Sequence, residues 1–139
     1  MLSIFAVGTM TFIDTVEAAI NPIDNEKEYT VESKEKSAKW IKFDSGTINF
    51  PKPDKGYRNK HSYVAYSKGS KDIRVNFYGY KIKNNKKTYV GALFLSKTGN
   101  KLTYYAIYST GKKEQPSYST TKMSVRQTYN AMISEMKKG

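Results

Sequence analysis

The chain has no cysteine and a single histidine, His61, among its 139 residues. Without cysteine it forms no disulfide bond, offers no thiolate nucleophile and cannot build the zinc or iron–sulfur sites that thiolates hold. One histidine rules out a metal centre made of several imidazole ligands, and a Ser-His-Asp triad would have to use His61 from inside a basic loop. We therefore predict no catalytic residue, no metal site and no cofactor.

Acidic side chains are scarce in the larger part of the chain. Residues 36–139 hold twenty-two lysines and arginines but only five acids: Asp44, Asp54, Asp72, Glu114 and Glu135. No two of these are spaced so as to orient the paired carboxylates of a glycoside hydrolase. Walker, dinucleotide-binding and HExxH patterns are also missing, so the sequence predicts a protein that is not an enzyme.

Charge is unevenly distributed along the chain. Residues 1–35 carry seven acids and two lysines, which leaves residues 36–139 with a net charge near +17. A field of this size attracts polyanions such as nucleic acid, anionic lipid or the phosphate-bearing polymers of a bacterial wall. A generic solubilising surface is the alternative interpretation.

The apolar run at residues 2–13 has the length of a signal-peptide core and is too short to span a bilayer comfortably. Small residues flank Glu17 in Val16-Glu17-Ala18, as a signal peptidase requires for cleavage after Ala18. We predict a signal peptide at residues 1–18, with a buried N-terminal helix as the alternative because the usual basic segment is missing. Export of a cysteine-free, lysine-rich chain is typical of Gram-positive bacteria and predicts an extracellular or cell-wall location; without export the location is cytoplasmic.

Two further parts follow the apolar start. Residues 19–37 are polar and mixed in charge, and we predict a partly ordered leader there. Residues 38–139 are expected to form a single domain, since the chain is 38% hydrophobic and 14% aromatic, enough to bury one core.

Alternation of apolar and polar residues predicts several strands in this domain. The expected strands lie at 38–43, 47–50 and 62–67, followed by three strands within 72–110. We expect Asp44-Ser45-Gly46 to turn the chain between the first two, Asn84-Asn85 and Thr98-Gly99 to join the last three, and residues 51–61 and 111–119 to be loops.

Pairing across these turns predicts which side chains share a face. A two-residue turn at Asn84-Asn85 pairs Phe77 with Ala92, and the next turn opposes Leu93 to Tyr104. One face is then aliphatic and aromatic, with Ile73, Val75, Phe77, Val90, Ala92, Phe94, Tyr105 and Ile107. The other face is rich in tyrosine, with Tyr78, Tyr80, Tyr89, Gly91, Leu93, Leu95, Leu102, Tyr104, Ala106 and Tyr108.

A closing helix is expected at about residues 122–136, capped by Thr120 or Thr121. Its apolar residues recur at helical spacing and should cover the aliphatic sheet face: Val125, Tyr129, Met132, Ile133 and Met136. The predicted fold class is therefore α+β, a mostly antiparallel meander of about five to seven strands with a C-terminal amphipathic helix packed on one face.

The candidate partner-binding residues form two groups. A shallow trough around Gly91 and Ala106 would be walled by Tyr78, Tyr89, Tyr104 and Tyr108, and Tyr80 is a further candidate on the same face. The loop at 51–61 contributes Lys52, Lys55, Arg58 and Lys60 as an anion-binding segment. The alternatives are a second layer that covers the tyrosine face and a loop that serves only as a solvated connection.

These features favour a small exported binding or cell-surface-associated protein whose basic, tyrosine-rich surface engages an anionic polymer, a glycan or a protein. A nucleic-acid-binding protein is the alternative, because lysines interleaved with aromatic residues suit a stacking platform. Against it, only three arginines are present, and no RNP or helix-turn-helix signature occurs. An inhibitor or immunity-type protein that binds another protein is a third reading.

Overall fold

The computed structural model describes residues 40–139. The predicted signal peptide at 1–18, the predicted leader at 19–37 and the first two residues of the strand predicted at 38–43 lie outside the described residues.

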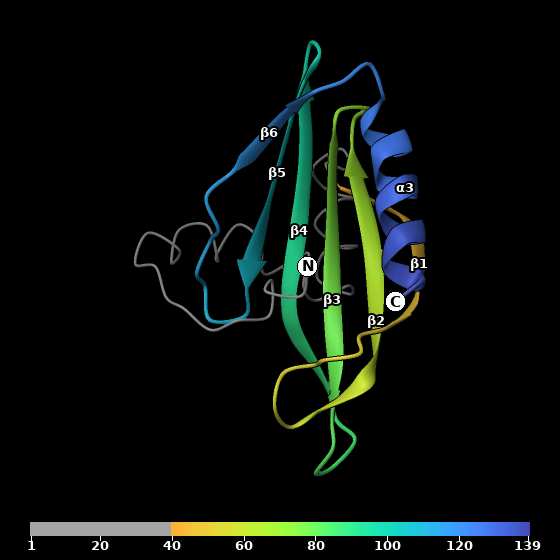
Figure 1. The fold of residues 1–139 in the computed structure, drawn as a ribbon, viewed down its shortest axis with the longest axis vertical. Helices are drawn as coiled ribbons and strands as arrows, with labels where there is room; N and C mark the ends of the chain where they lie inside the picture. The colour runs from red at the N-terminus through yellow and green to blue at the C-terminus, as the bar shows by residue number, and fades with distance from the viewer. Residues whose placement is uncertain (1–39) are drawn as a thin grey trace.

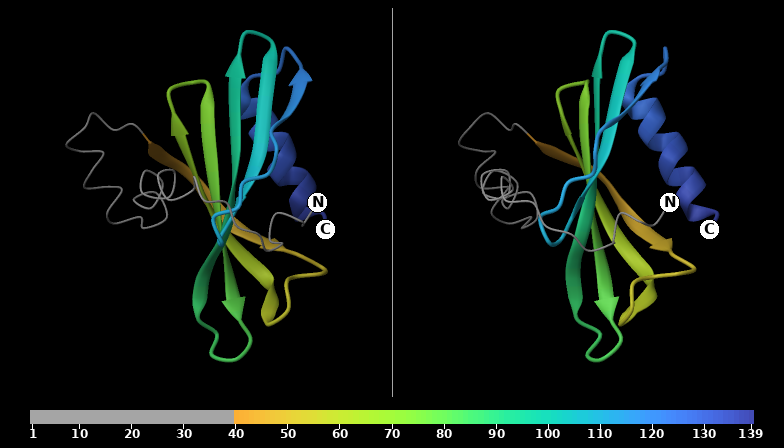
Figure 2. Two further views of the ribbon diagram at one scale, coloured as in Figure 1. Left: turned by 90° about the vertical axis from the view of Figure 1, so that its left-hand side faces the viewer. Right: turned by 60° about the vertical axis from the view of Figure 1, so that its left-hand side comes forward.

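The described chain forms one antiparallel sheet and one helix. Its six strands are hydrogen-bonded in chain order, and the helix packs on one side of the sheet (Figures 1 and 2). The elements are β1 Ile41–Asn49, β2 Tyr57–Lys68, β3 Asp72–Lys81, β4 Lys87–Thr98, β5 Lys101–Tyr108, β6 Ser117–Thr120 and α3 Val125–Lys137. This is the α+β meander that the sequence predicts.

A β-bulge in β4 changes the predicted register. Near the turn Tyr78 pairs with Tyr89, but Phe77 then pairs with Gly91, so Val90 is an extra residue in β4. The predicted pairing of Phe77 with Ala92 is therefore wrong. Because side chains alternate with a period of two, one inserted residue exchanges the faces for the rest of the strand.

The exchange moves β4 and β5 residues between the two predicted faces. Leu93 and Leu95, not Ala92 and Phe94, share the face of Val75 and its neighbours. Between β4 and β5, Leu93 opposes Ala106 and not Tyr104, because Gly99 and Asn100 alone connect the strands. This second difference is an even shift, so it leaves the faces unchanged.

The predicted N-terminal hairpin is wrong, because β1 runs unbroken through Asp44-Ser45-Gly46. An irregularity between Lys42 and Asp44 absorbs one residue. Gly46 does not form a turn but allows the Tyr63 side chain to approach β1 closely, since a Cβ at Gly46 would lie 2.8 Å from the Tyr63 hydroxyl oxygen. Because glycine has no side chain, the Tyr63 ring can lie across β1.

Two predicted loops also contain strands. β2 begins at Tyr57, inside the segment predicted as the loop 51–61. β6 lies at Ser117–Thr120, directly after Pro116 and at the edge of the sheet. Pro116 precedes the strand, so its missing N–H removes no hydrogen bond between strands.

The core lies between α3 and the sheet face of Ile73, Val75 and Phe77. The predicted helical stripe is confirmed: Val125, Tyr129, Ile133 and Met136 are buried, and Met132 packs against them. Burial of each such apolar side chain contributes about 1.5–3 kcal/mol, so the stripe is the main attachment of the helix.

A polar contact also joins α3 to β1. The Tyr129 hydroxyl donates a hydrogen bond to Asp44 Oδ2, and the Phe43 and Tyr129 rings meet edge to face at 5.0 Å. Burial, together with the hydrogen bond to Asp44, raises the pKa of Tyr129 well above its usual range. The phenol therefore stays protonated and keeps donating to the carboxylate.

The helix begins later than predicted. Ser124, and not Thr120 or Thr121, is the N-cap: its Oγ accepts from Gln127 N at 3.0 Å, and Gln127 Oε1 accepts from Ser124 N at 2.8 Å. This reciprocal capping box satisfies two backbone donors that the first turn would otherwise leave without partners.

We expect Ser124→Ala to lower the free energy of unfolding by about 1 kcal/mol, the usual cost of a lost N-cap. Urea denaturation followed by circular dichroism measures it. Ser134→Ala is the matched control, because Ser134 is exposed within the helix and alanine has the higher helix propensity. Equal stability of the two variants would contradict the capping role.

Candidate functional site

Two basic segments meet at one end of the sheet. In a meander, alternate connections lie at the same end, and here the β1–β2 loop lies beside the β3–β4 turn (lower end of Figure 1). Ile82 N donates to the Gly56 carbonyl at 2.9 Å, and Arg58 Nε donates to Asn85 Oδ1 at 3.0 Å. The two hydrogen bonds hold the segments together.

We call this region the basic end. It comprises eight exposed cations from the two segments and the strand ends beside them: Lys52, Lys55, Arg58, Lys60, Lys81, Lys83, Lys86 and Lys87. Asp54 is the one acidic residue between positions 50 and 61 or between 81 and 87. The only ion pair that joins two residues of the range 40–139 links Lys138 and Glu135, 3.6 Å apart, on α3. The charge of the basic end is therefore presented to solvent.

Contacts between three rings fix the β1–β2 loop to the sheet. Phe50 and His61 are both nearly fully buried and their tilted rings have centroids 4.7 Å apart, and the centroid of the Tyr57 ring lies 6.4 Å from that of His61. Gly79 lies beneath, where a Cβ would approach Tyr57 Cδ1 to 2.7 Å and His61 Nε2 to 3.0 Å. Glycine at 79 therefore makes room for both rings.

His61 is thus an internal residue and not part of an exposed basic loop. Its Nδ1 donates to the Asn59 carbonyl at 3.2 Å. Burial lowers the pKa of His61, although the Asn59 hydrogen bond and the Asp54 charge oppose this. Burial raises the pKa of Asp54, with the His61 charge acting in the other direction.

The predicted tyrosines separate into two groups. Tyr78 and Tyr89 meet edge to face at 5.9 Å, Lys87 Nζ lies 4.9 Å from the Tyr78 ring, and Tyr80 pairs with Lys87. These three tyrosines therefore border the basic end.

Tyr104 and Tyr108 lie elsewhere. Tyr104 is 43% exposed and opposite Leu95, whereas Tyr108 is buried and donates to Glu114 Oε2 at 2.8 Å. Tyr108, and not Ala106, opposes Gly91, so the predicted floor of the trough is wrong. Partner binding by the five tyrosines stays a prediction.

A buried polar cluster was not predicted. Arg74 and Asn76 are fully buried on the sheet face opposite α3. Arg74 Nε donates to Asn76 Oδ1 at 2.6 Å, its Nη2 donates to Tyr89 Oη at 3.1 Å, and its guanidinium lies 5.4 Å from the Phe94 ring. The sequence did carry a signal that these two polar residues share one face of a strand, because Arg74 and Asn76 alternate with Ile73, Val75 and Phe77.

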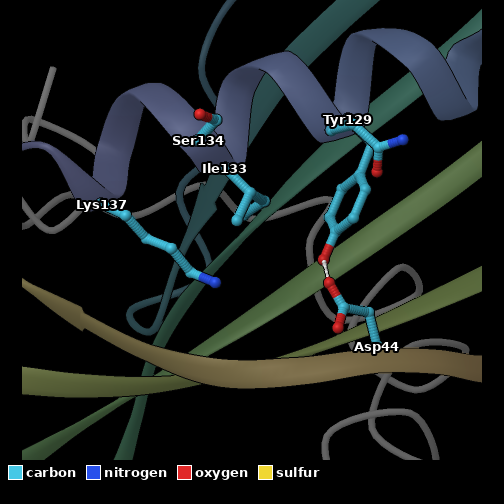
Figure 3. Close-up of a pocket in the computed structure, with 6 residues that line it drawn as sticks. Asp44, Tyr129, Ile133, Ser134 and Lys137 are labelled. Atoms are coloured by element: carbon cyan, nitrogen blue, oxygen red, sulfur yellow. Dashed lines mark hydrogen bonds between the residues drawn. The ribbon is translucent and has the colours of Figure 1, made fainter.

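A cavity of about 300 Å³ lies between α3 and β1 (Figure 3). Its lining consists of Asp44, Tyr129, Asn130, Ile133, Ser134 and Lys137. Asp44 accepts from Tyr129 through one oxygen and from Ser45 N at 2.9 Å through the other, and Lys137 Nζ lies 5.7 Å from the Tyr63 ring. The charged groups of this cavity hold the helix on the sheet.

Residues 40–139 contain no cluster of three or more histidines, aspartates and glutamates placed to hold a metal ion. Over the same range, no helix has the length and apolarity needed to cross a membrane. Comparison of the chain with protein-family models, curated proteins and solved structures found no match.

The burial of His61 predicts a pH-dependent stability. Because burial lowers its pKa, His61 takes up a proton at a lower pH in the folded state than in the unfolded chain, where the imidazole titrates near the ordinary pKa of 6.5. The free energy of unfolding should be unaffected well above this pH and should fall as the pH drops below it, with a slope of at most about 1.4 kcal/mol per pH unit.

Urea denaturation at several pH values between 5 and 8 measures this slope, with the interval chosen around the ordinary pKa. His61→Gln, which does not titrate, should remove it. Asp54→Asn is the control and should retain it, since a raised carboxyl pKa adds stability as the pH falls and so acts in the opposite sense. An unchanged slope in His61→Gln would refute the assignment.

Proposed function

We propose that this protein is a non-enzymatic binding protein that engages an anionic polymer through the basic end. The observation that carries the proposal is the meeting of eight exposed cations from two separate segments, with Asp54 as the only acid between them. Residues 40–139 as a whole hold twenty lysines and arginines against five acids, so the electrostatic field around the rest of the domain is positive, like that of the basic end. Such a field raises the local concentration of a polyanion and speeds its association.

The residue types favour a polymer with spaced charges. Seven of the eight cations are lysines, which act as mobile point charges, whereas arginine supplies the planar fork that reads bases and phosphates bidentately. The one arginine, Arg58, donates its Nε to Asn85. Anionic glycans and wall polymers suit this chemistry better than sequence-specific nucleic acid.

Tyrosines supplement the charge. Tyr78, Tyr80 and Tyr89 border the basic end and are each partly exposed. Aromatic rings beside lysines offer flat contact area to a sugar ring at low entropic cost. With the export predicted from residues 1–18, the partner would be a polymer, glycan or protein at an extracellular surface or cell wall.

The test is to neutralise three lysines of the basic end in Lys52→Gln/Lys83→Gln/Lys86→Gln. Because a lysine near an anionic surface contributes about 1 kcal/mol, binding to heparin and to long-chain polyphosphate should weaken about 100-fold. The slope of log K against log salt should also fall by about two to three units. Titration at several salt concentrations measures both quantities.

The matched control removes three charges from the opposite end in Lys71→Gln/Lys101→Gln/Lys122→Gln. These lysines lie near one another there, since Lys97 N donates to the Lys71 carbonyl at 3.0 Å and Thr121 N donates to the Asn100 carbonyl at 2.9 Å. We expect the control to retain most of the affinity. Equal losses in both variants would show that net charge alone is responsible. Tighter binding of single-stranded DNA than of heparin or polyphosphate at the same salt concentration would favour the nucleic-acid alternative.

A further inference from the structure

The β3–β4 turn is the outermost part of the basic end (lower end of Figure 1). All residues from 81 to 87 are exposed, and Ile82 is the one apolar residue among them. Ile82 has 56% of its surface exposed and stands between Lys81 and Lys83. The tip of the basic end therefore presents an aliphatic side chain to solvent with cations on both sides of it.

Backbone hydrogen bonds order this tip. Lys81 N donates to the Lys86 carbonyl at 3.0 Å, and Asn85 N donates to the Lys81 carbonyl at 2.7 Å. Asn85 has a φ of 56°, the left-handed conformation that asparagine tolerates in turns. Ile82 N donates to the Gly56 carbonyl, which attaches the tip to the β1–β2 loop. A partner that buries the Ile82 side chain therefore has no disordered turn to fix, and binding avoids that entropic cost.

Tyrosines lie directly behind the tip. Tyr80 precedes Ile82 by two residues, and Tyr78 pairs with Tyr89 one step further along the sheet. All three tyrosines are partly exposed. Tyrosine is enriched where an apolar medium meets water, because its ring is apolar and its hydroxyl is polar. The basic end thus combines an apolar tip, tyrosines behind it and lysines around both.

This combination favours a bilayer as an occupant of the tip. A single exposed isoleucine is common on protein surfaces, but here it lies at the extremity of a surface with eight exposed cations. A soluble polyanion satisfies the cations and offers no apolar phase to Ile82. A bilayer of anionic lipids offers a negative surface and hydrocarbon just beneath it. Lysine suits this boundary, because its aliphatic stem can lie among the headgroups while the ammonium stays in water.

We propose that the basic end also attaches to the surface of an anionic bilayer, with Ile82 inserted at the boundary of headgroups and acyl chains. The lysines then contact the lipid phosphates. This attachment rests on the proposed function, because the same cations attract both kinds of partner. Of two sources of phosphate, a soluble polymer and a lipid headgroup, only the lipid makes use of Ile82.

Full-length Ile82→Ser tests the insertion. Sedimentation with vesicles of phosphatidylglycerol and phosphatidylcholine in equal amounts measures the affinity. Binding should weaken about tenfold, because serine buries no aliphatic surface, while affinity for long-chain polyphosphate should stay within about twofold. Ile41→Ser is the matched control, since Ile41 is 55% exposed and pairs with Ser67 at the opposite end of the sheet. The control should leave vesicle binding unchanged.

A tryptophan at the tip reports insertion directly. Trp40 is the only tryptophan, so Ile82→Trp combined with Trp40→Phe places a single indole at the tip. Its emission should shift to the blue with the anionic vesicles, because the indole leaves water for the membrane interface. Polyphosphate and vesicles of phosphatidylcholine alone should cause no shift. An emission that anionic vesicles leave unchanged would overturn the insertion.

Lys52→Gln/Lys83→Gln/Lys86→Gln separates this attachment from the proposed function. The variant should bind both the anionic vesicles and polyphosphate more weakly, because its charges serve both partners. Unchanged polyphosphate binding in this variant would contradict the proposed function. Retained polyphosphate binding by the unmodified protein without binding to anionic vesicles, or equal vesicle affinity of Ile82→Ser and Ile41→Ser, would overturn the bilayer attachment alone.

Discussion

One inserted residue in β4 determines how the whole domain is assembled. The bulge at Val90 places Leu93 and Leu95 beside Val75, and through β5 it brings Leu102 and Ala106 to the same side. These residues form the surface on which the stripe of α3 is buried. Without the bulge, the alternation of β4 would direct Ala92 and Phe94 toward the helix, and the two faces would exchange their contents.

The two faces bury polar groups in different ways. On the helix side, Tyr129 and Asp44 form one hydrogen bond that joins α3 to β1, and both residues also line the cavity between these elements. On the other side, Arg74 is surrounded by Asn76, Tyr89 and Phe94.

Part of the candidate site was predictable from the sequence. The cations of the loop 51–61 were found from composition, and a meander places its first and third connections at one end, so the meeting of this loop with the β3–β4 turn follows from topology. The burial of His61 did not follow, because it depends on Gly79 of a neighbouring strand making room for the His61 and Tyr57 rings. The bulge had a local signal in Gly91, since glycine inside a strand pattern often marks one.

Four features could be predicted without the fold: the absence of thiol chemistry, the uneven charge, the antiparallel meander and the apolar stripe of the closing helix. These follow from composition and from periods of two and 3.6 residues, which are local properties of the chain. The cap at Ser124 also had a local signal, the three-residue spacing of Ser124 and Gln127 that is typical of a capping box. The faces of β4 and β5 and the burial of His61 and Arg74 follow only from the folded arrangement. Each depends on which distant residues lie opposite, and a single inserted residue changes that arrangement while leaving the local pattern of alternation almost intact.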